Sequence, residues 1–278
     1  MSDGKLYIVG TPIGNLSDFS PRGIETLENA DLIAAEDTRV SLKLLTHFGI
    51  KKPLISCYKP KEQEKSEQII SLIAEGKTIA LVSDAGMPCI SDPGYVLVKK
   101  CRELGIAVEV IPGCNAAVAA VAVSGISTER WTFEGFLPVG RKERSERLET
   151  IKSLPHTLVF YEAPHKIRQT LADLSGTLGA DREAALCREL TKLHEEVIGG
   201  TLGELSHYYD DAEPRGEYVI VIGGAQHTEE CYTIEQAVDL ARSLAEGGEK
   251  LSEACRQAAK TTGISKREIY SILTQEGN

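Results

Sequence analysis

Short apolar runs alternate with amphipathic segments through the first 125 residues of the chain. Such runs are typical of buried strands, and the amphipathic segments between them are typical of helices. The expected strands are Leu6–Val9, Leu32–Ala35, Leu54–Cys57, Thr78–Ser83 and Val108–Ile111. The expected helices are Arg39–Phe48, Glu64–Glu75 and Tyr95–Leu104, each followed directly by a glycine. Since glycine commonly ends a helix, this alternation predicts an α/β domain with a mainly parallel sheet.

A second series of the same kind follows a polar break at Ser124–Glu129, which we take as a domain boundary. An apolar helix is expected just before the break, over Asn115–Val123. Beyond it the expected strands are His156–Tyr161, Ala184–Arg188 and Tyr218–Ile222, and the expected helices are Lys142–Ser153, Lys166–Ser175 and Leu202–Tyr209. Tyr218–Ile222 is apolar throughout, as in a central strand covered on both faces. The sequence therefore predicts two α/β domains, over residues 1–125 and 126–225.

The segment after residue 225 has a different character. Gln226–Cys231 is polar, and the patterning beyond it is helical throughout. Leu251–Thr261 and Ser265–Leu273 are typical of two short helices around a turn at Gly263, an arrangement similar to a helix-turn-helix. We therefore expect a small all-helical appendage over residues 226–278, which either docks the substrate or caps the fold.

Composition places the chain among globular proteins that are not membrane-bound. Of its 278 residues, 42% are hydrophobic and 26% are charged. The longest apolar stretch, Ala116–Val123, falls far short of the roughly 20 residues that span a bilayer. The N-terminus lacks the apolar core of a signal peptide, so a cytoplasmic protein without a membrane anchor is expected.

The net charge of −10 bears on the class of partner. A protein that binds nucleic acid usually presents a basic surface, so either the ligand is not a nucleic acid or the positive charge is local. Arg141–Arg147 is the most basic segment and follows Gly140, although a solvated helix face explains it equally well.

The cysteines and histidines do not form a metal-binding pattern. Seven cysteines are scattered along the chain, no two of them are spaced as CxxC, and the six histidines form no HExxH motif. We expect buried, reduced thiols and no metal site.

A glycine-containing loop, Gly10–Leu16, follows the first expected strand. Glu36 and Asp37 follow the second strand, which invites comparison with a dinucleotide-binding site. However, the loop has the spacing GxxxG, and residues 15–20 come before Pro21 can begin a helix. A dinucleotide site needs GxGxxG opening directly into a helix. A nicotinamide cofactor is therefore not expected, and a plain tight loop remains an alternative.

Two further loops leave the carboxyl ends of expected strands. Ser83–Gly94 contains prolines and glycines that exclude helix and strand, and it is longer than an ordinary connection requires. Ile111–Ala117 turns sharply through Pro-Gly into a helix of small residues. Because open α/β sheets bind ligands at this edge, these loops predict a ligand site.

Together with motifs farther along, these loops resemble the tetrapyrrole methylase superfamily, and within it the branch that methylates small-subunit ribosomal RNA. The resemblance covers nearly the whole chain and rests on the motifs jointly. They are Leu6–Leu16, Ala35–Arg39, Phe133–Pro138, Phe160–Lys166 and Arg188–Lys192.

The resemblance implies two α/β domains with S-adenosylmethionine in the cleft between them, and usually a homodimer. It implies transfer of a methyl group to the 2′-hydroxyl of a cytidine in the decoding region of 16S ribosomal RNA, with the small ribosomal subunit as partner. The positions that it assigns to cofactor binding are Ile13, Asp84, Met87, Asn115, Ala116, Tyr161 and Pro214. Asp84 would accept hydrogen bonds or attract the sulfonium, Ala116 would leave room, and Ile13, Met87 and Tyr161 would supply apolar walls or belong to the core.

Methyl transfer to a ribose hydroxyl benefits from alignment in a water-poor cleft and from a group that takes the proton. The strand-following segments that carry such groups are 36–39 and 188–192. We expect Asp37 or Glu189 to act as base or orienting group. Arg39, Arg188 and Lys192 would bind phosphate or stabilise negative charge. Surface ion pairs among these residues are the alternative.

Two other functions remain open. The acidic charge favours a methyltransferase that acts on a tetrapyrrole or another small molecule. A non-catalytic ribosome-assembly factor that uses the cofactor only structurally is the second alternative. If RNA is the substrate, an acidic enzyme is expected to recognise the folded surface of the assembled subunit, since recognition of RNA by shape is common.

Overall fold

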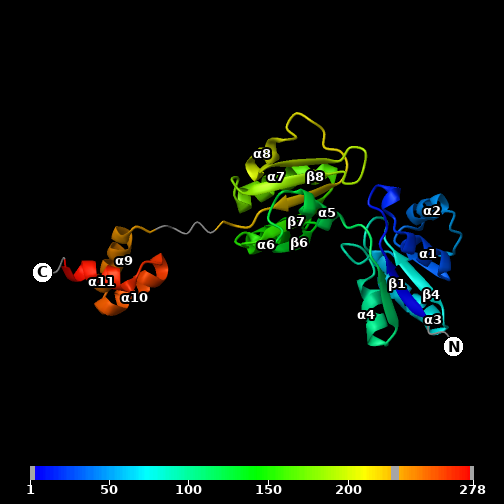
Figure 1. Cartoon of the computed structure of the whole chain (residues 1–278), viewed down its shortest axis with the longest axis horizontal. Coiled ribbons are helices and arrows are strands. Elements are labelled where there is room, and N and C mark those ends of the chain that lie inside the picture. Colours follow the sequence, from blue (N-terminus) through cyan, green and yellow to red (C-terminus); the bar gives the residue numbers. More distant parts are fainter. Residues whose placement is uncertain (1–3, 227–231, 276–278) are drawn as a thin grey trace. The chain divides into compact units, whose positions relative to one another are not determined.

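The computed structural model describes residues 4–226 and 232–275, which fall into two compact units (Figure 1). The first unit ends at Ala225 and contains two β-sheets, and the C-terminal unit starts at Gln226 and is helical. Of the predicted polar segment Gln226–Cys231, all but the first residue lies outside the described residues.

The first sheet contains five parallel strands in the order β3-β2-β4-β1-β5. The strands are β1 Lys5–Val9, β2 Leu32–Ala35, β3 Leu54–Ser56, β4 Thr78–Val82 and β5 Ala107–Ile111. The helices between them are α1 Pro21–Asn29, α2 Thr38–His47, α3 Glu62–Ala74 and α4 Tyr95–Glu103. The five strands and three helices expected here are confirmed, with ends that differ by no more than two residues.

Helices cover both faces of this sheet because its strands are apolar on both sides. Alternate residues of β2 point to opposite cores: Ile33 and Ala35 pack with α1 and α2, while Ala34 packs with α3 and α4. All three side chains are fully buried. This pattern is what a parallel sheet covered by helices requires.

The second sheet is mixed and has the order β6-β7-β10-β8-β9. Its strands are β6 Trp131–Gly135, β7 Thr157–Glu162, β8 Glu183–Arg188, β9 Glu196–Thr201 and β10 Tyr218–Ile222. The helices of this half are α5 Ala116–Val123, α6 Arg141–Ile151, α7 Ile167–Leu178 and α8 Leu202–His207. Only β6 and β7 pair in parallel; the other three pairings are antiparallel. Strand β10 is central and buried along its whole length, as its sequence predicts.

Two strands of this sheet, β6 and β9, are absent from the sequence prediction. Both lie at sheet edges, where one side of the strand is open and no continuous apolar run is needed. β9 contains Gly199 and Gly200, and β6 places the buried carboxylate of Glu134 in an ion pair with Arg147. The glycines of β9 and the buried charge of β6 interrupt the run of apolar residues from which a strand is predicted.

Helix α5 joins the two halves of the first unit. It begins directly after the loop that leaves β5, and the side chain of Asn115 accepts a hydrogen bond from the backbone N–H of Val118 at 3.0 Å. The helix packs on β7 and β10, where Ala120 and Val121 are buried among the residues of the second sheet. Helix α5 thus connects the carboxyl edge of the first sheet to one face of the second sheet.

The C-terminal unit is a bundle of α9 Ile234–Glu246, α10 Leu251–Thr262 and α11 Lys266–Gln275. It has a core of its own, formed by Ala237, Val238, Ala241, Cys255, Ala258 and Ile269. Gly263 follows α10 in the left-handed conformation with φ of +73°, which glycine adopts without strain. The prediction of a helical C-terminal segment is confirmed, and α9 adds a third helix to the two expected around the turn.

Short 3₁₀ helices complete the described elements: η1 Leu16–Asp18, η2 Lys59–Lys61 and η3 Pro164–Lys166. Among the described residues, no helix combines the length and the apolar character needed to cross a membrane. The six described cysteines are free thiols, four of them buried; Cys231 lies outside the described residues.

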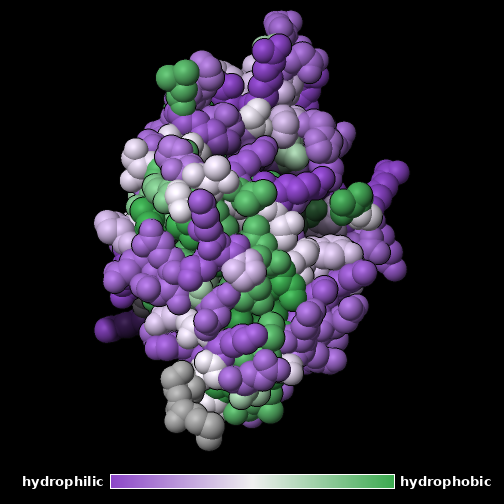
Figure 2. All heavy atoms as spheres, turned by 90° about the vertical axis from the view of Figure 1, so that its right-hand side faces the viewer, coloured by the Kyte–Doolittle hydropathy of each residue, from purple (hydrophilic) through white to green (hydrophobic). Residues whose placement is uncertain are grey.

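Hydrophobic residues also reach the surface, as in the face shown in Figure 2, where they form a band between hydrophilic ones. On α4 and the edge strand β5, Tyr95 is 65% exposed and Val110 is 58% exposed. A second copy of the chain could cover such apolar side chains. The homodimer stays a prediction: light scattering should give twice the mass of the chain, and the mass of one chain would contradict it.

Candidate active site

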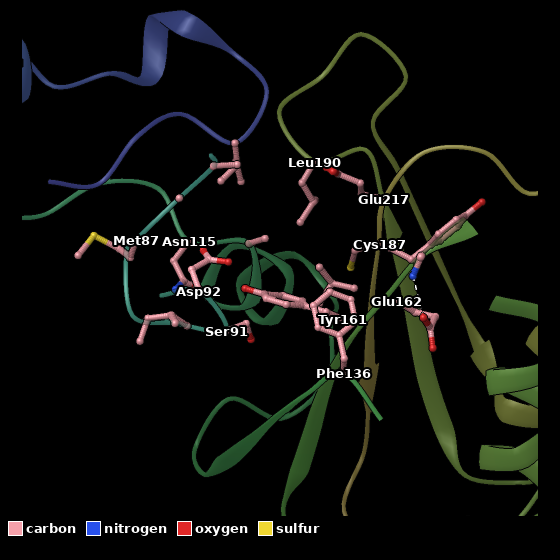
Figure 3. Close-up of a pocket in the computed structure, with 18 of the residues that line it drawn as sticks. Met87, Ser91, Asp92, Asn115, Phe136, Tyr161, Glu162, Cys187, Leu190 and Glu217 are labelled. Carbon is pink, nitrogen blue, oxygen red and sulfur yellow. Dashed lines mark hydrogen bonds between the residues drawn. The ribbon is translucent and has the colours of Figure 1, made fainter. Parts of the chain in front are cut away.

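A cavity of about 380 Å³ lies between the two sheets of the first unit (Figure 3). The first half contributes Ile13, Ala85, Gly86, Met87, Ile90, Ser91, Asp92, Asn115 and Ala116. The second half contributes Phe136, Tyr161, Glu162, Ala163, Pro164, Cys187, Leu190, Lys192, Glu217, Tyr218 and Val219. The walls are mainly apolar with a few polar groups, which is typical of small-molecule and cofactor sites.

The order of the first sheet brings three loops to this cavity. Strands β4, β1 and β5 are neighbours and parallel, so the loops that follow them leave the same edge. Thr11 and Gly86 exchange two backbone hydrogen bonds of 2.9 and 3.1 Å. Gly10 and Gly113 meet backbone to backbone, since a Cβ on Gly10 would lie 2.7 Å from the nitrogen of Gly113. The three loops singled out in the sequence therefore form one wall.

The loop from Ser83 to Gly94 contains strained backbone. Cys89 and Ser91 have φ of 71° and 68°, a region that residues with side chains rarely adopt. The buried carboxylate of Glu62, at the start of α3, accepts hydrogen bonds from the backbone N–H groups of Gly94 and Val96 at 2.8 and 3.0 Å. This contact anchors the end of the loop and helps to hold the strained residues in place.

Tyr161 forms the opposite wall. It lies near the end of β7, and its ring makes edge contacts with Phe133 and Phe136 at centroid distances of 4.9 and 5.7 Å. Its hydroxyl accepts a hydrogen bond from the backbone N–H of Ala117 at 3.1 Å. Figure 3 shows the hydroxyl end of the ring directed toward the side of the cavity where Asn115 and Asp92 lie.

A second loop with left-handed backbone, residues 188–192, contributes Leu190 and Lys192 to the cavity wall. Glu189 and Thr191 have φ of 50° and 66°. The Glu189 carboxylate accepts hydrogen bonds from the backbone N–H of Glu217 at 3.0 Å and from the Lys192 ammonium at 2.8 Å. Burial raises the pKa of Glu189, but these hydrogen bonds outweigh it and the pKa lies below its usual value. Glu189 thus organises the loop that carries Leu190 to the cavity.

Of the five residues predicted to be catalytic, the structure places only Lys192 in the cavity wall. The Asp37 carboxylate accepts a hydrogen bond from the Arg39 guanidinium at 3.0 Å, which lowers the pKa of Asp37 to about 2. Arg188 forms an ion pair with Glu196 at 3.0 Å. Asp37, Arg39, Arg188 and Glu189 are thus held in ion pairs outside the cavity lining, although their part in catalysis stays a prediction.

Of the seven residues predicted to bind the cofactor, five line the cavity: Ile13, Met87, Asn115, Ala116 and Tyr161. Asp84 lies in an adjacent hollow, where its carboxylate accepts a hydrogen bond from the backbone N–H of Asp37 at 3.0 Å. Pro214 is not among the described residues that line either space. Their roles toward a cofactor stay predictions.

Three carboxyl groups lie close to one another at the carboxyl edge of the first sheet. Burial, followed by the charges of Asp92 and Asp84, raises the pKa of Glu36 to about 7. Burial, followed by the charge of Asp84, raises the pKa of Asp92 to about 6. Burial also raises the pKa of Asp84. Within residues 4–226 and 232–275, no group of three or more acidic, histidine or cysteine side chains is arranged to hold a metal ion.

Sequence reasoning missed several residues of the lining. Phe136, Leu190 and Cys187 lie in or beside the segments quoted as motifs, but nothing in their spacing separates them from core residues. Asp92 stands in a Ser-Asp-Pro-Gly stretch, which by itself is typical of a turn. The one sequence feature that points to a site is the position of Asp92 in the loop that follows the central strand β4.

Two sheets bridged by one helix, with a largely apolar cavity between them, define an α/β protein with a candidate site for a small ligand. Comparison with known proteins is specific: the family model for tetrapyrrole (corrin/porphyrin) methylases matches residues 5–206. The chain belongs to this family of methylases. Membership confirms the prediction of a methyltransferase that depends on S-adenosylmethionine.

Relatives match over nearly their whole length. "Ribosomal RNA small subunit methyltransferase I" of Halalkalibacterium halodurans is 45% identical over 277 residues, covering 98% of this chain and 96% of the relative. The protein of the same name from Escherichia coli O157:H7 is 43% identical over 281 residues, covering 99% and 97%.

Solved structures of lower identity share the fold. A diphthine synthase, 16% identical, superposes with a TM-score of 0.64 over 80% of this chain and 90% of its own. A uroporphyrin-III C-methyltransferase from Thermus thermophilus in complex with S-adenosylhomocysteine, 18% identical, gives a TM-score of 0.55 over 79% of this chain and 97% of its own. These likenesses confirm the predicted fold class.

We predict that Glu36→Gln stabilises the protein at high pH. Because the pKa of Glu36 in the folded state is about 7, above the usual 4.5, the ionised carboxylate disfavours folding. This penalty grows as the pH rises from about 4.5 to 7 and is complete above 7. At pH 8 the variant should gain about 1 kcal/mol, a small value because solvent screens the partly exposed carboxylate; near pH 4.5 it should gain nothing.

Urea unfolding of the variant and the natural protein at both pH values measures this difference. Glu28→Gln, on the exposed side of α1, is the matched control and should change neither value. A gain that is the same at pH 4.5 and pH 8 would contradict the assigned pKa.

Proposed function

We propose that this protein transfers a methyl group from S-adenosylmethionine to the 2′-hydroxyl of a cytidine in the decoding region of 16S ribosomal RNA, within the small ribosomal subunit. The observation that carries the proposal is end-to-end similarity to relatives named ribosomal RNA small subunit methyltransferase I, at 42 to 45% identity. The choice of cytidine and of the 2′-hydroxyl rests on the sequence motifs that resemble that branch of the family. Such an enzyme works in the cytoplasm, where ribosomes are assembled.

The cavity has the chemistry that the cofactor requires. Its apolar residues, among them Ile13, Met87 and Phe136, suit an adenine ring and a thioether, and Asn115 offers a polar contact. When bound, S-adenosylmethionine supplies a methyl group on a positively charged sulfur, which a hydroxyl oxygen can displace. The protein's part is to hold both reactants in line and to exclude water, and alignment of this kind accounts for much of the rate in such reactions.

The basic segment Arg141–Arg147 offers less free charge to RNA than its sequence suggests. In the structure it forms α6, where Arg144 pairs with Asp173 at 2.6 Å and Lys142 pairs with Glu146 at 3.9 Å. Arg147 pairs with Glu134. We therefore infer that the enzyme recognises the folded surface of the assembled subunit and does not depend on charge alone.

A transfer assay tests the proposed function. The protein, radiolabelled S-adenosylmethionine and small subunits that lack the modification should yield label in 16S RNA. The labelled cytidine should resist alkaline cleavage at its 3′ phosphodiester bond, because that cleavage needs a free 2′-hydroxyl. Subunits that already carry the modification are the control and should accept no label, and protein-free 16S RNA should accept much less than intact subunits.

The alternatives predict different results. Label in a tetrapyrrole or another small molecule, with none in RNA, would support a small-molecule methyltransferase. Cofactor binding with no transfer to any of these acceptors would support an assembly factor. Equal labelling of protein-free RNA and intact subunits would refute recognition of the assembled surface.

The C-terminal unit supplies the next prediction, that it docks the enzyme on its substrate. Ser252, Ser265, Lys266, Arg267, Tyr270 and Ser271 line a shallow hollow on α10 and α11. Hydroxyl, basic and aromatic groups of this kind suit an RNA backbone. Because this unit has its own core, a chain that ends at Ala225 should stay folded and bind S-adenosylhomocysteine normally. It should methylate subunits at least about tenfold more slowly, the effect of losing roughly 1.4 kcal/mol of binding.

The transfer assay and calorimetry on the truncated chain measure both properties. Full activity on subunits would refute the docking role. Loss of folding would show that the helices cap the first unit.

A further inference from the structure

The cavity wall contains seven side chains that can gain or lose a proton: Asp92, Tyr161, Glu162, Cys187, Lys192, Glu217 and Tyr218. A proton acceptor for the substrate hydroxyl must be unprotonated at neutral pH and must not already be saturated with hydrogen bonds. The hydrogen bonds and ion pairs of the described residues decide which of the seven meets both conditions.

Two of the three carboxylates are already engaged. The carboxylate of Glu162, which is 5% exposed, accepts hydrogen bonds from the backbone N–H of Ala163 at 2.8 Å and from the Thr170 hydroxyl at 2.6 Å. The carboxylate of Glu217 forms an ion pair of 2.8 Å with Lys192, and its side chain is mostly exposed to solvent. Both are held by their partners and are poor proton acceptors.

Of the other four groups, Tyr161, Cys187 and Lys192 are protonated at neutral pH, and Tyr218 is already engaged in a hydrogen bond. Burial raises the pKa of the Cys187 thiol to about 11 and raises the pKa of Tyr161 above its usual value. The Tyr218 hydroxyl accepts a hydrogen bond from the backbone N–H of Arg215 at 3.1 Å. The pKa of Lys192 lies above its usual value: burial lowers it, but the hydrogen bonds from Lys192 to Glu189 and Glu217 outweigh this.

Asp92 remains. It is partly buried, it follows the strained residues Cys89 and Ser91, and its neighbour Pro93 is buried. Within the described chain no ion pair joins it to a lysine or arginine. The nearby Ser83 hydroxyl donates a hydrogen bond to the backbone carbonyl of Gly86 at 3.2 Å, and it lowers the pKa of Asp92 with a smaller effect than burial and Asp84. The rigid loop thus presents a carboxylate to the cavity at the side toward which the Tyr161 hydroxyl is directed (Figure 3).

The groups around Asp92 explain its protonation behaviour. Asp84 and Glu36, from the loops after β4 and β2, are acidic, and Cys89 and Tyr161 are uncharged at neutral pH. Lys59 is the positive charge that acts on it, with a smaller effect than burial and Asp84. The resulting pKa of about 6 leaves the carboxylate ionised at pH 7 and still basic enough to take a proton.

We propose that Asp92 is the general base of the methyl transfer. This inference rests on the proposed function, since it takes the nucleophile to be a ribose hydroxyl. Asp92 accepts the proton of the 2′-hydroxyl while the hydroxyl oxygen forms its bond to the methyl carbon. The bond from that carbon to sulfur breaks and its electron pair stays on sulfur, so that S-adenosylhomocysteine leaves as a neutral thioether. Asp92 then releases the proton to water.

The variants Asp92→Asn and Asp92→Glu test this assignment in the full chain, with small subunits that lack the modification as substrate. Asp92→Asn should lower kcat about 100-fold or more, the usual contribution of a general base. Its affinity for S-adenosylhomocysteine, measured by calorimetry, should stay within about threefold, a change of less than 1 kcal/mol. Asp92→Glu, which restores a carboxylate, should recover part of the rate. Glu67→Gln, a surface carboxylate on α3 paired with Lys100, is the control and should leave both values unchanged.

The pH profile separates a base from a structural carboxylate. Because the ionised form is the active one, kcat/KM of the natural protein should fall about tenfold for each pH unit below about 6 and level off above it. The residual kcat/KM of Asp92→Asn should not decrease in this way below pH 6.

Three results would overturn the assignment. One is a kcat for Asp92→Asn within threefold of the natural value. Another is a loss of S-adenosylhomocysteine affinity of more than tenfold with an unchanged rate at saturation, which would make Asp92 a cofactor ligand. The third is an unchanged acid limb in Asp92→Asn. If the natural protein labels no RNA, the proposed function itself is refuted, and the role of Asp92 is refuted with it.

Discussion

The packing of α5 against the second sheet is the contact on which the cavity depends. This helix starts at the carboxyl edge of one sheet, and its small side chains let it lie close under the other. Ala120 and Val121 are buried with Val159 and Val221 of strands β7 and β10. The hydrogen bond from the backbone N–H of Ala117 to the Tyr161 hydroxyl ties the first turn of the helix to the cavity wall. Ala120 is fully buried in this contact, which leaves no room for a larger side chain.

Backbone strain is concentrated in the two loops that face each other across the cavity. In the described chain, four residues other than glycine have positive φ: Cys89, Ser91, Glu189 and Thr191. Each such residue costs on the order of 1 kcal/mol and persists only where its surroundings fix it. Glu62 does this for one loop and Glu189 for the other. Gly216 leaves the room that the Glu189 side chain fills, since a Cβ on Gly216 would lie 2.4 Å from Glu189 Cγ. The rest of the fold thus offsets the strain of two loops that line the cavity.

Burial decided how much of the fold could be predicted from the sequence. Strands covered on both faces, such as β4 and β10, are continuous apolar runs and were found almost to the residue. β9 was not, because an edge strand with two glycines needs no such run. The mixed pairing of the second sheet could not be read from the sequence either, since a buried strand has the same composition in either direction.

The candidate site was predicted in outline only. The three loops after β1, β4 and β5 were found because their glycines and prolines exclude regular structure. Which side chains face the cavity depends on partners that are distant in the sequence. The charged groups of Asp37 and Arg39 neutralise each other, and Arg188 pairs with Glu196, whereas Asp92 has no such partner in the described chain. Spacing along the sequence does not carry this information.

The central claim is that the cavity between the two sheets holds the methyl donor, and calorimetry with S-adenosylhomocysteine tests it most directly. Ala116 lines the cavity, while Ala122 lies on the same helix and faces solvent. The natural protein and Ala122→Phe should each bind one ligand per chain with the same affinity. Ala116→Phe, which fills the cavity, should bind at least about tenfold more weakly, a loss of 1.4 kcal/mol or more. Unchanged affinity in Ala116→Phe, with the fold intact by circular dichroism, would contradict the claim.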